Sequence, residues 1–298
     1  MIISVWLRII RIKFLFASII SITISLLYSY FAYNQFNLID AILTYIGVIF
    51  LHASVDLFND YWDYKRGIDI ATKRTAYSGG TGILPEKKLE PGIVYKAGLF
   101  CLFVGSFIGI YFIIYSGFII AVILAIAVTS IYFYSTTIVN IGLGETFVAI
   151  KGLMIVIGTS YVQTGILDVS IFFLGIIMGL LSSIVLFNAS FPDYEADKAK
   201  GRRTLVIIFG KEKGIIIYSF MISFIYSLIV IGILLEYLPM YSIITFIPLS
   251  FAIRSFKLLV KNYEKIEDIV KSISYTIKFS RTFGISLIIS YLIAILIK

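Results

Sequence analysis

Residues 41–69 read AILTYIGVIFLHASVDLFNDYWDYKRGID, an apolar segment that ends in several acidic residues. Residues 41–51 carry no charge, and Asp56, Asp60 and Asp63 then follow within an otherwise apolar segment. An apolar segment of about 20 residues is long enough to cross a membrane as a helix. Acidic side chains in such a helix are costly unless they have a partner. The stretch therefore predicts a membrane helix whose inner end carries a functional site.

The composition shows that such apolar segments recur along the chain. Of its 298 residues, 60% are hydrophobic and only 14% are charged, and the mean hydropathy is +1.00. Soluble domains carry about 25% charged residues, so a secreted scaffold, a disordered chain and a nucleic-acid binder are excluded. The single cysteine, Cys101, allows no intrachain disulfide. The hydrophobic residues suffice for about nine spans of about 20 residues.

Nine segments with little or no charge are separated by polar residues, and we expect each to be a transmembrane helix. The predicted spans are residues 14–33, 41–59, 97–115, 117–135, 146–164, 170–190, 215–235, 238–253 and 282–297. The first span has no small-residue cleavage site, so it is expected to be retained rather than removed as a signal peptide. The predicted fold class is an all-α membrane helical bundle, with residues 1–298 forming a single intramembrane domain.

The distribution of basic residues predicts the topology of this bundle. All 25 Lys and Arg residues except Lys151 and Lys298 lie in segments that nine spans place on one side. These segments are residues 8–13, 65–96, 198–213 and 254–281. Because basic loops remain in the cytoplasm, the N-terminus and the long loops after spans 2, 6 and 8 are expected to be cytoplasmic.

A first polar cluster lies at the inner end of the second span. His52, Asp56, Asn59, Asp60 and Asp63 are spaced by three and four residues, so they share one helix face. Oxygen atoms gathered in this way suit Mg²⁺, which also binds substrate phosphate oxygens. The alternative is an ordinary solvated helix end. His52 alone is expected to be a packed polar residue rather than a ligand.

A second polar cluster, NASFPDYEADKAKGRRT at residues 188–204, lies at the inner end of the sixth span. Asp193 and Asp197 are four residues apart on one helix face, and Pro192 is expected to bend the helix. Both acidic clusters lie at the same side of the membrane and are followed by basic residues. They predict a site where carboxylates hold Mg²⁺ and arginines bind a diphosphate.

Other features lie near the two clusters. The loop 72–85 contains Arg74 and the sequence SGGTG at 78–82, whose backbone amides could approach a phosphate, so a lid is favoured over a plain flexible loop. Lys151 is an intramembrane lysine, for which a functional role and snorkelling to the interface are equally open. Tyr134 ends the fourth span on the inner side.

Several short motifs point together to one family. They are residues 59–69, 78–82, 144–145, 158–165, 191–197 and 201–205. With them the sequence resembles the UbiA superfamily of intramembrane aromatic prenyltransferases, most of all the 1,4-dihydroxy-2-naphthoate polyprenyltransferase branch of menaquinone synthesis. The resemblance implies Mg²⁺-dependent transfer of a polyprenyl group from an allylic diphosphate to an aromatic acceptor. Alternatives are 4-hydroxybenzoate, haem or a glyceryl phosphate lipid as acceptor and, less favoured, a cation-coupled transporter.

The resemblance and the clusters together assign roles to individual residues. The expected metal ligands are Asn59, Asp63, Asp69, Asp193 and Asp197. The residues expected to bind the diphosphate are Lys73, Arg74, Lys198, Arg202 and Arg203. The expected catalytic residues are Asp60, Asp63, Asp193, Tyr134 and Lys151. The expected setting is the plasma membrane with the site on the cytoplasmic side, the two substrates and the lipid bilayer as partners, and no nucleic acid. Isoprenoid length and oligomeric state stay open.

Overall fold

The computed structural model describes residues 2–72 and 74–298, and within these residues it contains helices and no strands. The spanning helices are α2 (Ile12–Tyr33), α3 (Leu38–Lys65), α5 (Pro91–Ser116), α6 (Phe118–Phe133), α7 (Gly144–Thr164), α8 (Val169–Ala189), α11 (Lys211–Leu234), α12 (Leu249–Asn262) and α13 (Ile266–Ile297). The fourth span continues α6 to Ile141, and the eighth begins at Met240, before α12. In this part of the chain nine helical segments are long and apolar enough to cross a membrane, which confirms the predicted all-α bundle.

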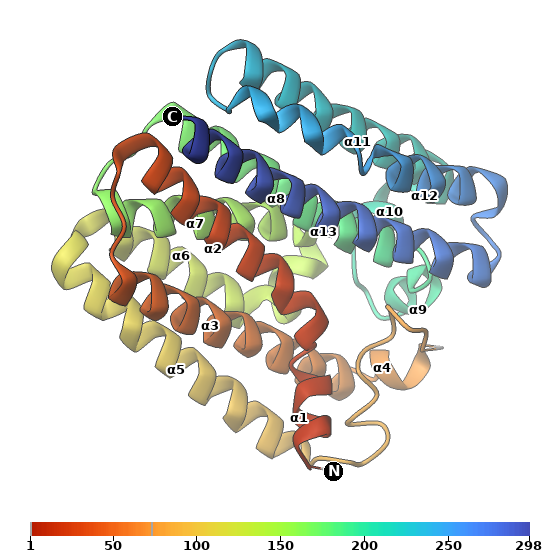
Figure 1. Cartoon of the computed structure of the whole chain (residues 1–298). Coiled ribbons are helices and arrows are strands. Elements are labelled where there is room, and N and C mark those ends of the chain that lie inside the picture. Colours follow the sequence, from red (N-terminus) through yellow and green to blue (C-terminus); the bar gives the residue numbers. More distant parts are fainter. Residues whose placement is uncertain (1, 73) are drawn as a thin grey trace.

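Short helices precede the first span or lie between later spans. They are α1 (Ile2–Ile9), α4 (Ile68–Ala71), α9 (Tyr194–Ala199) and α10 (Leu205–Phe209). Figure 1 shows α1, α4 and α9 at the end that holds the N-terminus, with the C-terminus at the other end. An odd number of spans requires this separation of the two termini.

Helix α2 packs against α7, α13 and α3, while α3 packs against α5 and α7 against α8. The approach of α7 and α8 depends on Gly152 and Gly179, because a Cβ at Gly152 would lie 2.6 Å from the Cα of Gly179. In lipid, the hydrophobic effect does not drive helices together. Close packing at small residues stabilises the contact between them instead. The largest apolar core is formed by buried side chains of α2, α8, α11 and α13.

The predicted long loop at 254–281 is wrong. Helix α12 continues to Asn262 and α13 already begins at Ile266, so most of this segment is helical. The 32 residues of α13 make a helix of about 48 Å, longer than the roughly 30 Å of a bilayer core. Its basic first half can therefore extend beyond the apolar region, and its charges do not end the helix.

Two breaks in regular helix lie at the end of the bundle that holds the N-terminus. After α6, residues Tyr134–Ile138 form a π-helical turn, η1, of a kind often found at functional sites. After α8, the predicted bend at Pro192 is a full break, because α8 ends at Ala189 and α9 begins at Tyr194. Both breaks bring polar side chains to the ends of the spans.

Candidate active site

A cavity of about 590 Å³ lies where α3, α4, α8 and α9 meet, at the end of the bundle that holds the N-terminus. The two acidic clusters, far apart in the sequence, both contribute to its wall. The lining includes all the residues expected to bind a metal, namely Asn59, Asp63, Asp69, Asp193 and Asp197. The structure therefore brings together the five oxygen-bearing side chains that the sequence pattern singled out.

Arg202 lies between the two acidic clusters. Its guanidinium forms ion pairs with Asp63 of the first cluster and with Asp197 of the second, the latter at 3.4 Å between Nη1 and Oδ1. Asn59 orients Asp63 by donating from Nδ2 to Oδ2 at 2.8 Å. Burial lowers the pKa of Arg202, but the charges of Asp63 and Asp197 outweigh it and raise the pKa. This arginine is thus a fixed cation inside the acidic cavity.

The glycine-rich loop closes one side of the cavity. The backbone amide of Gly79 donates to Oδ2 of Asp193 at 3.3 Å. Gly80 has φ +68° and lies against Asp69, so that a Cβ there would overlap the carboxylate. Arg74 lines the cavity and donates to the carbonyl oxygen of Thr81 at 3.3 Å. The loop therefore touches the second acidic cluster and Asp69 at once.

Burial raises the pKa of two carboxylates in the cavity wall. Burial, and then the charges of Asp63 and Asp60, raise the pKa of Asp69 to about 8. Burial and Asp197 raise the pKa of Asp193 to about 7. Oδ1 of Asp193 is buried and has no hydrogen-bond partner in the part of the chain that the structure describes. These carboxylates are in an environment that favours an added cation.

The donor set fits Mg²⁺ in its chemistry, since carboxylate and amide oxygens are the ligands this ion prefers. In residues 2–72 and 74–298, no three acidic, His or Cys side chains converge closely enough to hold an ion by themselves. Magnesium is usually bound by one or two carboxylates together with waters and substrate phosphates rather than by a complete protein cage. Arg202 pairs with both Asp63 and Asp197, and its position between them explains why these carboxylates do not converge on one point.

Asp60 does not join the other acidic residues. Its Oδ1 accepts from Nη2 of Arg11 at 2.8 Å, and its Oδ2 accepts from the hydroxyl of Thr81. The residue is buried and is not part of the cavity wall. Both oxygens are engaged by protein groups, so Asp60 links Arg11 to the glycine-rich loop and does not reach the cavity, where the sequence predicted a catalytic role for it.

The basic residues predicted to bind diphosphate are only partly at the cavity. Arg74 and Arg202 line it, whereas Lys198 and Arg203 are exposed and lie outside its wall. The ammonium of Lys198 lies over the ring of Tyr194 at 5.4 Å. Lys73 lies outside the described residues. Which basic side chains line the cavity depends on the direction in which each side chain points. A run of basic residues in the sequence does not give these directions.

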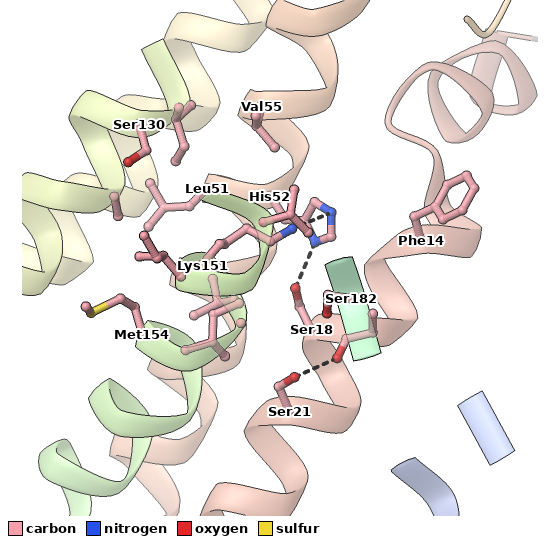
Figure 2. Close-up of a pocket in the computed structure, with 18 of the residues that line it drawn as sticks. Phe14, Ser18, Ser21, Leu51, His52, Val55, Ser130, Lys151, Met154 and Ser182 are labelled. Atoms are coloured by element: carbon pink, nitrogen blue, oxygen red, sulfur yellow. Dashed lines mark hydrogen bonds between the residues drawn. The ribbon is translucent and has the colours of Figure 1, made fainter. Parts of the chain in front are cut away.

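Tyr134 connects the acidic cavity to a second one, which holds Lys151. Tyr134 and Asn59 line both cavities. The second cavity, of about 360 Å³, extends between α2, α3 and α7, and Lys151 lies in its wall next to His52 (Figure 2). Lys151 is therefore placed beside the acidic site rather than within it.

Two polar residues near the site belong to the quoted motifs but were assigned no site role from the sequence. Arg66 donates from Nη1 to the carbonyl oxygen of Ser135 at 2.9 Å and from Nη2 to that of Lys200 at 3.0 Å. It thereby joins the ends of α3, η1 and α9. Glu145 lines the acidic cavity and accepts from the backbone amide of Leu205 at 3.0 Å. For both Arg66 and Glu145, the sequence feature that could have indicated a role at the site is a charge directly at the end of an apolar span.

Residues 15–294 match the UbiA prenyltransferase family. The chain belongs to this family. It is 24% identical to a 1,4-dihydroxy-2-naphthoate octaprenyltransferase of Bacillus subtilis, over 88% of this chain and 84% of the relative. It is 30% identical to the enzyme of the same name from Haemophilus influenzae, over 63% of each chain. The predicted resemblance and the prediction of a prenyltransferase enzyme are confirmed.

Solved structures show the same fold. A UbiA homologue from Archaeoglobus fulgidus bound to GPP and Mg²⁺ has a TM-score of 0.66 at 12% identity, covering 95% of this chain and 99% of that chain. A digeranylgeranylglyceryl phosphate synthase has a TM-score of 0.66 at 19% identity, covering 97% and 98%. At these identities the likeness concerns the architecture, so this UbiA prenyltransferase is an integral membrane protein built as those helical bundles are.

Proposed function

We propose that this UbiA prenyltransferase transfers a polyprenyl group from an allylic diphosphate to an aromatic acceptor of the 1,4-dihydroxy-2-naphthoate type, with Mg²⁺ as cofactor, in quinone biosynthesis. The observation that carries the proposal is the joint cavity of the two acidic clusters, with Arg202 between them. The names of the two bacterial relatives support the acceptor class. A homologue bound to GPP and Mg²⁺ supports the donor and the metal.

The residues of the cavity have complementary tasks in this reaction. Asn59, Asp63, Asp69, Asp193 and Asp197 would hold the metal. Bound Mg²⁺ would neutralise charge on the leaving diphosphate. Arg74 and Arg202 can form charge-assisted hydrogen bonds to phosphate oxygens, which strengthen as the carbon–oxygen bond of the allylic diphosphate breaks. The ring of Tyr134 can stabilise the positive charge left on the prenyl carbon, which an electron-rich ring carbon then attacks.

The apolar setting serves the same reaction. The second cavity is lined by apolar side chains of α5 and α6, where an isoprenoid tail can lie out of water. We further propose that residues 1–298 act as one domain in the plasma membrane, with the acidic cavity on the cytoplasmic side. The concentration of basic residues around the inner helix ends supports this orientation.

A transfer assay tests the proposed function. The purified protein in lipid nanodiscs is given radiolabelled polyprenyl diphosphate and one acceptor at a time, namely 1,4-dihydroxy-2-naphthoate, 4-hydroxybenzoate, haem or a glyceryl phosphate lipid. We expect a labelled lipid-soluble product with the naphthoate, its loss on treatment with EDTA, and its return with added Mg²⁺. Product with the glyceryl phosphate lipid alone, or full activity in EDTA, would contradict the proposal.

A further inference from the structure

A buried polar cluster in the second cavity has no part in the metal and diphosphate site. It consists of Ser18 on α2, His52 and Asp56 on α3, and Lys151 on α7, all in the cavity wall. Nδ1 of His52 lies 2.8 Å from the hydroxyl of Ser18, and Nζ of Lys151 lies 3.5 Å from Nε2 of His52. Figure 2 shows the end of the Lys151 side chain next to the imidazole of His52, with a dashed line from the ring to the hydroxyl of Ser18.

The charges in this cluster are not matched to each other. Asp56 is 9% exposed, and its Oδ2 has no hydrogen-bond partner within residues 2–72 and 74–298. That oxygen is 4.0 Å from Nε2 of His52, and Lys151 approaches the same nitrogen. The nearby Arg11 is bound to Asp60. An ammonium and a carboxylate thus face one space without directly bonding.

An isoprenoid tail cannot satisfy these groups. Unpaired charge in a membrane interior is costly, and intramembrane ionisable residues usually serve a substrate. The cavity has an apolar end lined by Phe112, Ile120 and Ile123, which suits a hydrocarbon chain. Its polar wall requires a ligand with both a negative group and a hydrogen-bond donor. Because Asn59 and Tyr134 line both cavities, such a ligand would adjoin the prenyl diphosphate.

We propose that Asp56 and Lys151 form the acceptor subsite and select an aromatic hydroxy acid. Lys151 pairs with the carboxylate of the acceptor, and Oδ2 of Asp56 accepts the hydrogen of a ring hydroxyl. His52 is a positioning residue, which Ser18 holds through Nδ1 and which keeps the ammonium beside Asp56. This assignment rests on the proposed function and adds to it the residues that recognise the acceptor.

The chemistry of the transfer follows from this placement. As the ring hydroxyl gives its proton to Asp56, electron density rises on the ring, and a ring carbon forms the new bond to the prenyl carbon. The carbon–oxygen bond to the diphosphate breaks, and its electron pair leaves with the diphosphate. The attacked ring carbon then loses its hydrogen as a proton to an oxygen of the departing diphosphate, or its carboxylate as carbon dioxide. Aromaticity is restored, and Asp56 returns its proton to the ring oxygen.

Acceptor analogues test the subsite, first in the unaltered protein. Transfer to 1,4-dihydroxy-2-naphthoate is compared with transfer to 1,4-naphthalenediol, which lacks the carboxylate. A charge-assisted contact is worth roughly tenfold to a hundredfold, so the diol should have an acceptor KM higher by that factor. Lys151→Met should raise the KM for the naphthoate by the same factor while the KM for the diol stays near its original value. Asp56→Asn should lower kcat with both acceptors.

Controls separate this result from a general loss of structure. Ser182→Ala alters another residue of the cavity wall, whose hydroxyl already bonds to the carbonyl oxygen of Met178 at 3.1 Å, and should leave acceptor kinetics unchanged. Lys151→Arg should restore part of the preference for the acid. Equal KM values for acid and diol in the unaltered protein would overturn the subsite while the proposed function stands. Absence of transfer to any aromatic acceptor would overturn the proposed function itself.

Discussion

Asp60 and Asp63 are one turn apart on α3, yet they have different partners. Asp63 faces the acidic cavity and pairs with Arg202, whereas Asp60 is bound by Arg11 and Thr81. Residues three apart on a helix lie on neighbouring faces, so the pattern alone placed both in one site. The division depends on Arg11, which precedes α2, and on the glycine-rich loop. The order of residues within α3 does not contain that information.

Asp60→Asn should destabilise the protein rather than stop its chemistry. The change leaves Arg11 without its carboxylate partner and weakens a buried charge-assisted hydrogen bond, which costs about 1.5–3 kcal/mol. Unfolding of the variant in detergent should show this loss, while prenyl transfer per folded molecule is largely kept. Glu267→Gln, at an exposed glutamate, is the control. Normal stability with abolished transfer would return Asp60 to a catalytic role.

Asp63→Asn and Asp193→Asn should each abolish prenyl transfer. Both side chains line the acidic cavity, and each change removes a negative charge where a cation is expected. The initial rate with saturating Mg²⁺ should fall by more than about tenfold, as expected for a lost charge-assisted contact. Glu195→Gln, on the exposed side of α9 between Asp193 and Asp197, should retain its activity. Rates near that of the unaltered protein in both variants would argue against the metal site.

Among the elements around the cavity, the glycine-rich loop offers a test of how Asp69 is held. Gly80 has φ +68° and its missing Cβ makes room for the carboxylate of Asp69. Gly117, between α5 and α6, has φ +80° and no heavy atom within 4 Å of a Cβ built there. Alanine at either position carries a backbone cost of about 1–3 kcal/mol, because both φ values are positive. Only Gly80→Ala also displaces Asp69.

Gly80→Ala should therefore raise the Mg²⁺ concentration needed for half-maximal activity, whereas Gly117→Ala should lower stability alone. Activity is measured across a Mg²⁺ titration, and stability by thermal unfolding of the same samples. Equal Mg²⁺ dependence in the two variants would mean that the loop does not position Asp69.

The sequence allowed the number of spans and the meeting of the acidic clusters to be predicted, because both depend on apolar length and helical spacing. It did not reveal that α13 starts at Ile266, since its basic first half resembles a loop to any hydropathy argument. Nor could it show that Arg203 and Lys198 are exposed while Arg202 lies inside. Those directions depend on the break after α8, whose geometry is set by packing against neighbouring helices.

In the molecule as a whole, the acidic cavity and the short helices around it lie at one end of the bundle. The short helices α1, α4 and α9 lie at the end with the N-terminus, and the acidic cavity opens among the elements there (Figure 1). The predicted turns at the other end carry Asp40, Asp168 and Glu236 and no basic residue. Tyr28 and Tyr33 bind Asp168 through their hydroxyl groups and tie α2 to the start of α8. The two ends therefore differ in charge. One holds the acidic cavity, and the other holds contacts that join helices.

This asymmetry predicts the orientation of the protein in its membrane. Because basic loops are retained in the cytoplasm, the end that holds the cavity should face inward. Cys101 is replaced by alanine, and single cysteines are introduced as Lys88→Cys, Lys200→Cys or Ile166→Cys. A membrane-impermeant thiol reagent should label intact cells only at position 166, and should label positions 88 and 200 in inside-out vesicles. The prenyl diphosphate would then reach its site directly from the cytoplasm. Labelling of position 88 or 200 from outside would reverse the topology and place the cavity on the opposite side of the membrane.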